Sequence, residues 1–154
     1  MINRSDLENF WTRGDIHTRI HKAMSEAGLN DKKLEIEDLF PIDQYHARGI
    51  AATVDLGKRM PISENQRIID IGCGLGGPAR YFAKQFKCFI TGIDITPSFI
   101  EIGNKFNNLT SMSKQVSLQI GNGETLDFED ESFDGGYSQH VTMNIKNRKE
   151  FFLE

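Results

Sequence analysis

The chain has 154 residues, enough for one domain with a buried core, and its 38% apolar and 26% charged residues are typical of a globular protein. The formal net charge of −4 argues against nucleic acid as the main partner, because phosphate binding needs clustered Lys and Arg. The sequence has no apolar run near the roughly 18 residues of a membrane span and no apolar core of a signal peptide, and its two cysteines are too few for a disulfide framework. We therefore expect a cytoplasmic location.

The first sixty residues have a helical pattern. A capping box at Ser5 and Glu8 predicts a first helix, and Asp15 precedes an apolar face that ends at Gly28. The stretch "DLFPID" predicts a break, after which Asp43 can cap a third helix. We expect an N-terminal helical cap over residues 1–60, with helices that end near Gly14, span 16–27 and span 44–60.

From Arg67 onward, short apolar segments alternate with helical ones. Strands separated by helices of this size predict right-handed βαβ units and a mostly parallel sheet, so we expect an α/β fold over residues 61–154. The expected strands are 67–71, 88–94, 115–120 and 133–139, and the expected helices are 78–86, 97–106 and one that begins near 147.

A glycine-rich turn joins the first strand to its helix. Four glycines fall within residues 72–77, and Pro78 occupies the first helical position, where a missing N–H costs nothing. Glycine permits positive φ and lacks the Cβ that would block a ligand, and a helix N-terminus presents unpaired N–H groups to an anion. Ligands of open α/β folds bind at this edge of the sheet. The turn therefore predicts a site for a small ligand with a negative group.

The spacing of the turn fits two kinds of ligand. Gly72 to Gly77 fit GxGxxG, with Asp94 about 20 residues on, as in dinucleotide-binding proteins. Gly72 to Gly76 also fit GxGxG, and Asp70 stands two residues before the first glycine. That acid is unfavourable beside the phosphates of NAD but suits an ammonium next to a carboxylate. S-adenosylmethionine carries both groups, so we favour it and keep NAD as the lesser alternative.

The segment "DIGCGLGGPARYFA" resembles motif I of class I S-adenosylmethionine-dependent methyltransferases. Its GGPAR variant is similar to the branch that holds sterol, tocopherol and small-amine methyltransferases. The resemblance continues through "TGIDITPSFIEIG", "GNGETLDFEDESFD" and "GYSQHVTMNI", and covers roughly residues 43–154. It implies a Rossmann-like fold with strand order 3-2-1-4, and methyl transfer to a small-molecule acceptor. A non-catalytic S-adenosylmethionine-binding remnant or partner subunit is the alternative.

The resemblance assigns the methionine end of the cofactor to the glycine turn. Gly72, Gly74 and Gly76 would line the methionine part of S-adenosylmethionine, and Asp70 would lie near its ammonium. Cys73 belongs to the same cofactor-binding turn, where we interpret its side chain as a small filler and not as a nucleophile.

The resemblance assigns the adenosine end to two later segments. Asp94 matches the acid that accepts both ribose hydroxyls, although a helix-capping role is the alternative, and Ile95 would touch the adenine face. Asn122 replaces the acid that usually accepts from the adenine amino group, and its side-chain oxygen can still accept. Gly123 and Glu124 would flank the ring.

Histidines provide the candidates for acid–base chemistry and for metal binding. Gln139 and His140 follow the fourth strand, where the methyl group and the acceptor would meet, so His140 is the candidate base and His46 the second. A plain polar residue at a strand end is an equal alternative for His140. His17 and His21 lie four residues apart on a helix, but no third ligand is evident, so we expect a solvated helix face and no metal site.

The family's sheet continues beyond the strands found here, so we expect this sequence to be the cofactor-binding half of a longer enzyme. The fourth strand would then be an exposed edge, and Phe151, Phe152 and Leu153 would form an apolar patch. Self-association through this edge is expected, unless the N-terminal helices cover it.

Overall fold

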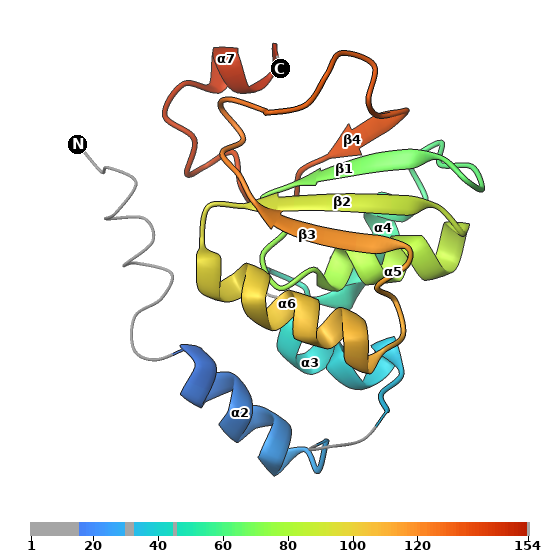
Figure 1. Ribbon diagram of the computed structural model, residues 1–154, viewed down its shortest axis with the longest axis vertical. Helices are drawn as coiled ribbons and strands as arrows, with labels where there is room; N and C mark the ends of the chain where they lie inside the picture. Colours follow the sequence, from blue (N-terminus) through green and yellow to red (C-terminus); the bar gives the residue numbers. More distant parts are fainter. Residues whose placement is uncertain (1–15, 30–32, 45, 154) are drawn as a thin grey trace.

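Four parallel strands form the centre of the computed structural model, which describes residues 16–29, 33–44 and 46–153. The strand order is β3-β2-β1-β4, as predicted (Figure 1). In the register, Ile68 pairs with Ile90, and Asp70 of β1 lies between Gly92 of β2 and Tyr137 of β4. The strands span Arg67–Ile71 (β1), Phe89–Asp94 (β2), Val116–Ile120 (β3) and Gly135–Tyr137 (β4).

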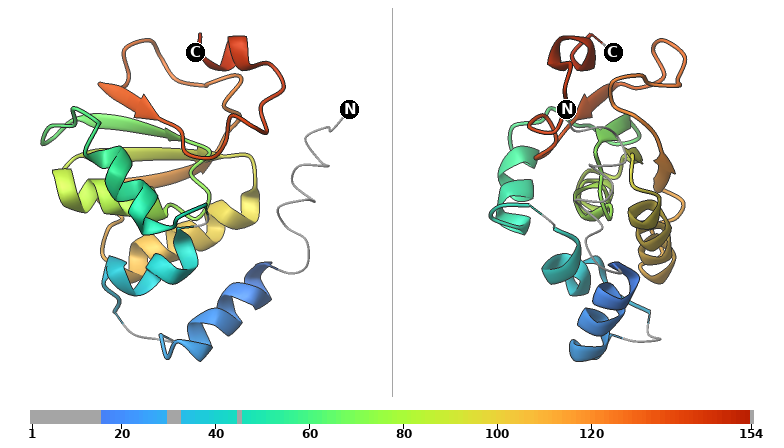
Figure 2. Two further views of the ribbon diagram at one scale, coloured as in Figure 1. Left: turned by 180° about the vertical axis from the view of Figure 1, so that it is seen from behind. Right: turned by 90° about the vertical axis from the view of Figure 1, so that its left-hand side faces the viewer.

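Two helices that connect the strands pack on the same face of the sheet (Figures 1 and 2). Helix α5 (Gly77–Phe86) follows Gly76, which is in the left-handed region, and ends before Lys87, which is also left-handed. Helix α6 (Pro97–Leu109) has Pro97 in its first turn and continues three residues beyond the predicted end. Their buried faces complete the core under the sheet with Phe82, Ala83, Ile100 and Phe106.

The N-terminal helices confirm one of the expected elements and correct two. Helix α2 (Ile16–Glu26) is present as predicted and packs against α6, whereas the expected helix before Gly14 lies outside the described residues. The predicted break at "DLFPID" is wrong, because residues 36–39 form the 3-10 helix η1 and Phe40–Asp43 form helix α3. The division at residue 60 stays a prediction.

The third N-terminal helix begins later than predicted. Helix α4 spans Ile50–Gly57 and does not begin at Gln44, because Arg48 and Gly49 both have positive φ and interrupt helical geometry. Asp43 does not cap it; its carboxylate is buried against Arg80 on α5.

The C-terminal residues pack against the turn after β3. Helix α7 (Arg148–Phe151) has Asn147 as its N-cap, and the side chain of Asn147 accepts from the Glu150 N–H. The expectation of three exposed apolar residues is wrong for Phe151, which is 5% exposed, because its ring fills the space left by the missing Cβ of Gly123. Phe152 and Leu153 are 72% and 75% exposed, as expected.

Strand β4 stands at an edge of the sheet. In the described part of the chain its ladder hydrogen bonds join it to β1. Helices α2 and α3 lie at the opposite end of the molecule from β4 and α7, so these two N-terminal helices do not cover this edge (Figures 1 and 2). Among the described residues, no helix combines the length and the hydropathy that crossing a membrane requires.

Candidate functional site

The glycine turn is anchored to the carboxyl end of the neighbouring strand. The N–H groups of Gly72 and Cys73 both donate to the Ile93 carbonyl oxygen, at 2.8 and 2.9 Å. The first residue after the anchored part of the turn is Gly74, which has positive φ and open space where a Cβ would stand. Bare, accessible backbone is therefore present at the predicted edge of the sheet.

The other two glycines of the GxGxG pattern are in contact with side chains. A Cβ on Gly72 would lie 2.2 Å from Val141, so Val141 covers that part of the turn. Gly76 differs from the expectation that it lines a ligand: it is buried, and a Cβ there would lie 2.7 Å from Leu118. Gly76 is needed for close packing of the turn on β3, whereas Gly74 offers the open surface.

The Asp94 carboxylate bonds to the glycine turn and to the residue that precedes α6. Its Oδ2 accepts from the Gly74 N–H at 3.0 Å and its Oδ1 accepts from the Thr96 N–H at 2.9 Å, just before α6. Burial raises the pKa of Asp94, although the hydrogen bonds from Thr96 and Gly74 oppose that shift. Since each carboxylate oxygen has two lone pairs, the capping role leaves room for two ligand hydroxyls.

Asp70 has a partner that the sequence analysis missed. The carboxyl group is 2% exposed, and the Tyr137 hydroxyl donates to its Oδ2 at 2.8 Å. Burial raises the pKa of Asp70 to about 7, and the charge of Asp94 adds to this, while the bond from Tyr137 opposes it. Near neutral pH this acid is therefore poised between its neutral and ionised forms. Tyr137 of β4 lies directly opposite Asp70 of the adjacent β1, so the pair can be found only once the strand order and register are known.

Cys73 points into the core under the turn. Its side chain is 5% exposed, and its Sγ would lie 2.9 Å from a Cβ on Gly92. Burial raises the pKa of the thiol well above its usual value, and the nearby carboxylates Asp70 and Asp94 add to the shift. The thiol is therefore not a nucleophile. The backbone of Cys73 is used within the turn, because its N–H donates to Ile93 and its carbonyl oxygen accepts from the Gly76 N–H.

The residues predicted for the adenine ring form a second turn, after β3. The Asn122 Oδ1 accepts from the Glu124 N–H at 3.0 Å, which leaves one lone pair for a ligand amino group. Glu124 accepts from the backbone N–H at the N-cap of α7, and Gly123 is buried against Phe151. Ile95 is half-buried at the end of β2.

Both candidate bases lie side by side. The His46 and His140 rings are stacked, with centroids 5.5 Å apart and planes 9° apart, although the residues are far apart in sequence. Burial lowers the pKa of His46, and the charge of His140 adds to this. The buried Thr53 hydroxyl donates to Gln44 Oε1 at 2.6 Å, and its oxygen also lies 3.2 Å from His46 Nε2 and 3.4 Å from Gln139 Oε1. No local pattern marks Thr53, because only the fold brings it near Gln139.

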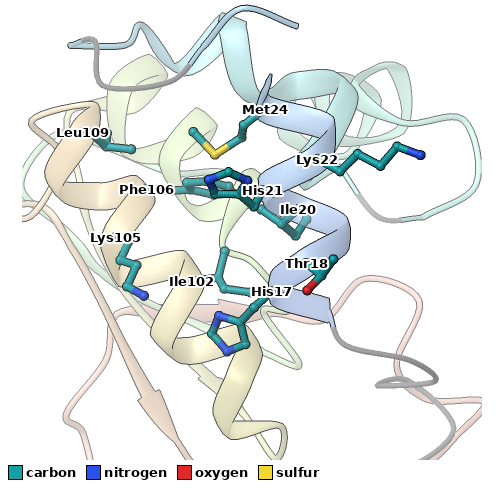
Figure 3. A pocket seen from close by; sticks show the side chains of 10 residues that line it. All are labelled: His17, Thr18, Ile20, His21, Lys22, Met24, Ile102, Lys105, Phe106 and Leu109. Carbon is teal, nitrogen blue, oxygen red and sulfur yellow. The ribbon is translucent and has the colours of Figure 1, made fainter. Parts of the chain in front are cut away.

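The structure places His17 and His21 on helix α2, away from the glycine turn. They line a shallow groove of about 480 Å³ between α2 and α6, whose floor includes Ile102 and Phe106 (Figure 3). His17 Nε2 lies 3.6 Å from a Glu101 carboxylate oxygen. Within the described residues, no three His, Cys, Asp or Glu side chains are close enough to hold a metal ion. The groove is apolar and contains none of the predicted cofactor-binding residues.

Comparison with known proteins decides the family. A family model described as "Methyltransferase domain" matches residues 69–154, more than half of the chain. The chain belongs to this family, the class I S-adenosylmethionine-dependent methyltransferases. The match contains the glycine turn, Asp94, the turn after β3 and the segment after β4, whereas Gln44, His46 and Thr53 lie outside it.

Relatives of this methyltransferase domain act on different acceptors, according to their names. The chain is 35% identical over 89 residues to a sterol 24-C-methyltransferase of Debaryomyces hansenii, which covers 58% of this chain and 24% of the relative. It is 27% identical over 119 residues to phosphoethanolamine N-methyltransferase 1 of Arabidopsis thaliana, which covers 77% of this chain and 24% of the relative. The chain thus spans about a quarter of the length of these two relatives.

Solved structures share the fold of the domain. The YcgJ protein of Bacillus subtilis superimposes with a TM-score of 0.62 at 24% identity, over 66% of this chain and 43% of that one. A geranyl diphosphate C-methyltransferase of Streptomyces coelicolor, solved with S-adenosyl-L-homocysteine, gives a TM-score of 0.64 at 17% identity, over 67% and 39%.

Proposed function

We propose that the chain binds S-adenosylmethionine at the glycine turn and supports transfer of its methyl group to a small-molecule acceptor. The observation that carries the proposal is the bond between Asp94 and the Gly74 N–H, which sets an acid with spare lone pairs beside open backbone. Family membership of residues 69–154 supports the same ligand.

The proposed roles divide between binding and alignment. The open backbone at Gly74 receives the amino-acid end of the cofactor, and Asp94 accepts from the ribose. Bound S-adenosylmethionine supplies an activated methyl group on a sulfonium. The main task of the protein is then to align the acceptor for in-line attack and to exclude water. A base is required only where the acceptor carries a proton, and His140, with His46 against its ring, is placed for that step.

The first prediction concerns ligand choice. We expect isothermal calorimetry to show binding of S-adenosylhomocysteine and no binding of NAD, because Asp70 is unfavourable beside phosphates. NAD binding without a response to S-adenosylhomocysteine would overturn the proposal. Turnover with a panel of sterol, amine and phenol acceptors distinguishes an active methyltransferase from a domain that binds the cofactor and acts through a partner chain.

The second prediction concerns self-association of the 154-residue chain. Strand β4 is an edge of the sheet, and Phe152 and Leu153 are exposed, so both backbone pairing and apolar contact are available to another copy. We expect sedimentation velocity at low micromolar concentration to show concentration-dependent association that Phe152→Ser with Leu153→Ser reduces. A chain that stays monomeric with robust turnover on a small acceptor contradicts this prediction.

A further inference from the structure

Helix α7 is attached to the turn after β3 by a hydrogen bond and by an apolar contact. Where the helix begins, Glu124 Oε1 accepts from the Asn147 N–H at 2.9 Å. At its other end, the Phe151 ring is 5% exposed, and its Cε2 lies 3.0 Å from where a Cβ on Gly123 would stand. That Cβ would also lie 2.6 Å from Ile71 Cγ2 on β1. The backbone of Gly123 is therefore held between β1 and α7, without room for a side chain.

The same turn carries Asn122, the residue predicted to contact the adenine amino group. The Asn122 Oδ1 accepts from the Glu124 N–H at 3.0 Å, and the Asn122 carbonyl oxygen accepts from the Thr125 N–H at 3.1 Å. At the start of the turn, the Gly121 N–H donates to the Asp94 carbonyl oxygen at 3.0 Å. The turn is thus fixed to β2 at its start, and α7 is the element that packs on its centre.

An asparagine amide can present either of two groups to a base. Its oxygen accepts from a 6-amino group, whereas its NH₂ group donates to a 6-carbonyl oxygen. A carboxylate would present acceptors only, so the orientation of the side chain matters because residue 122 is an asparagine. The bond from the Glu124 N–H fixes the orientation of the Asn122 amide, since a flipped amide would place its NH₂ group against that N–H. Selection of a base therefore depends on the conformation of this turn.

We propose that Phe151 is a positioning residue that holds the Asn122 amide with Oδ1 toward the 6-amino group of adenine, and so gives the site its preference for a 6-aminopurine over a 6-oxopurine. The inference rests on the proposed function, because it takes S-adenosylmethionine as the ligand. Without the Phe151 ring, the turn loses its packing, the Glu124 N–H no longer holds Oδ1, and the amide is free to donate to a 6-carbonyl oxygen. A merely structural role of Phe151 predicts instead an equal loss of affinity for both purines.

The test uses two neighbouring phenylalanines and two ligands that differ at one position of the base. Phe151→Ala removes the ring that packs on Gly123, and the matched control Phe152→Ala removes a ring that is 72% exposed. Calorimetry measures binding of S-adenosylhomocysteine and of S-inosylhomocysteine, in which a carbonyl oxygen replaces the 6-amino group. Hydrogen exchange of the Glu124 and Thr125 amides, followed by NMR in the free protein, measures the order of the turn. Thermal unfolding shows whether each variant folds.

We expect the wild type and the Phe152→Ala control to bind S-adenosylhomocysteine about tenfold more tightly than S-inosylhomocysteine, because a site that accepts from an amino group rejects an analogue that lacks it. Phe151→Ala should reduce this preference to less than about threefold and should speed exchange of the two amides. Wild-type exchange or an unchanged preference in a folded Phe151→Ala variant would overturn the inference, as would equal binding of the two compounds by the wild type. If the wild type binds neither compound, the proposed function fails, and exchange in the free protein still decides whether Phe151 orders the turn.

A milder variant serves if Phe151→Ala does not fold. Phe151→Leu keeps an apolar side chain at the buried position but lacks Cε2, the ring atom nearest to Gly123. We expect it to fold, to reduce the preference for S-adenosylhomocysteine over S-inosylhomocysteine, and to speed exchange of the Glu124 and Thr125 amides. Wild-type values of both quantities in this variant would again overturn the inference.

Discussion

Replacing Asp94 with alanine is expected to weaken binding of S-adenosylhomocysteine by about 1.5–3 kcal/mol, or about 10- to 150-fold, which is the scale of hydrogen bonds to a charged group. Two losses contribute to the weaker binding. The variant loses the acceptor for the ribose hydroxyls, and it releases the Gly74 N–H that now donates to Oδ2. Because the site lies at the end of β2 and not within the core, the fold should survive. Calorimetry gives the change in affinity.

Two controls separate ligand contact from damage to the turn. Asp130→Ala removes the same charge from an exposed position in the acidic loop and should leave affinity unchanged. Asp94→Asn keeps one acceptor oxygen and should give an intermediate loss. Wild-type affinity in a folded Asp94→Ala variant removes Asp94 from the ribose role and leaves only its cap on the Thr96 N–H.

The sheet could be predicted from sequence because its signals are local. Each strand and helix is marked directly by apolar runs, by the prolines at positions 78 and 97, or by the glycine turn. The right-handed crossover rule then restricts the order of the strands. The third N-terminal helix was placed wrongly because Arg48 has positive φ, a backbone state that an arginine does not signal. Phe151 was expected to be exposed because its packing against Gly123 depends on a turn 28 residues earlier.

The arrangement of the candidate site could be predicted only where its residues follow a local pattern, and its role stays a prediction. The glycine turn and Asp94 follow from spacing along the chain, and the structure brings them together at 3.0 Å. The contacts of Tyr137 with Asp70, of Asp43 with Arg80 and of Thr53 with Gln139 span 37 to 86 residues. Their residues carry no local motif, so only the tertiary fold identifies them.

Asp70→Asn is expected to raise stability and lower cofactor affinity at the same time. The folded pKa of about 7 lies above the usual aspartate pKa of 3.8, so between these values the folded state holds a proton that the unfolded state has lost. The free energy of unfolding therefore falls as pH rises from about 4 to about 7, and the loss is largest above pH 7. At about 1.4 kcal/mol per pKa unit, the asparagine variant should gain about 2–4 kcal/mol at pH 8 and little at pH 4.

Ligand binding should show the opposite dependence, because the ammonium of S-adenosylhomocysteine favours ionised Asp70. Wild-type affinity should therefore rise as pH increases through about 7, and Asp70→Asn should abolish that rise. The pKa of Asp43 is also raised, to about 6, so only the difference between the wild type and the Asp70 variant isolates this group. Methylthioadenosine, which lacks the ammonium, is the matched ligand and should bind both proteins equally between pH 6 and 8. Urea unfolding measures the stability and calorimetry measures the affinity across this range. The prediction is contradicted if the Asp70→Asn variant is less stable than the wild type at pH 8, because burial of an ionised Asp70 would then not destabilise the fold.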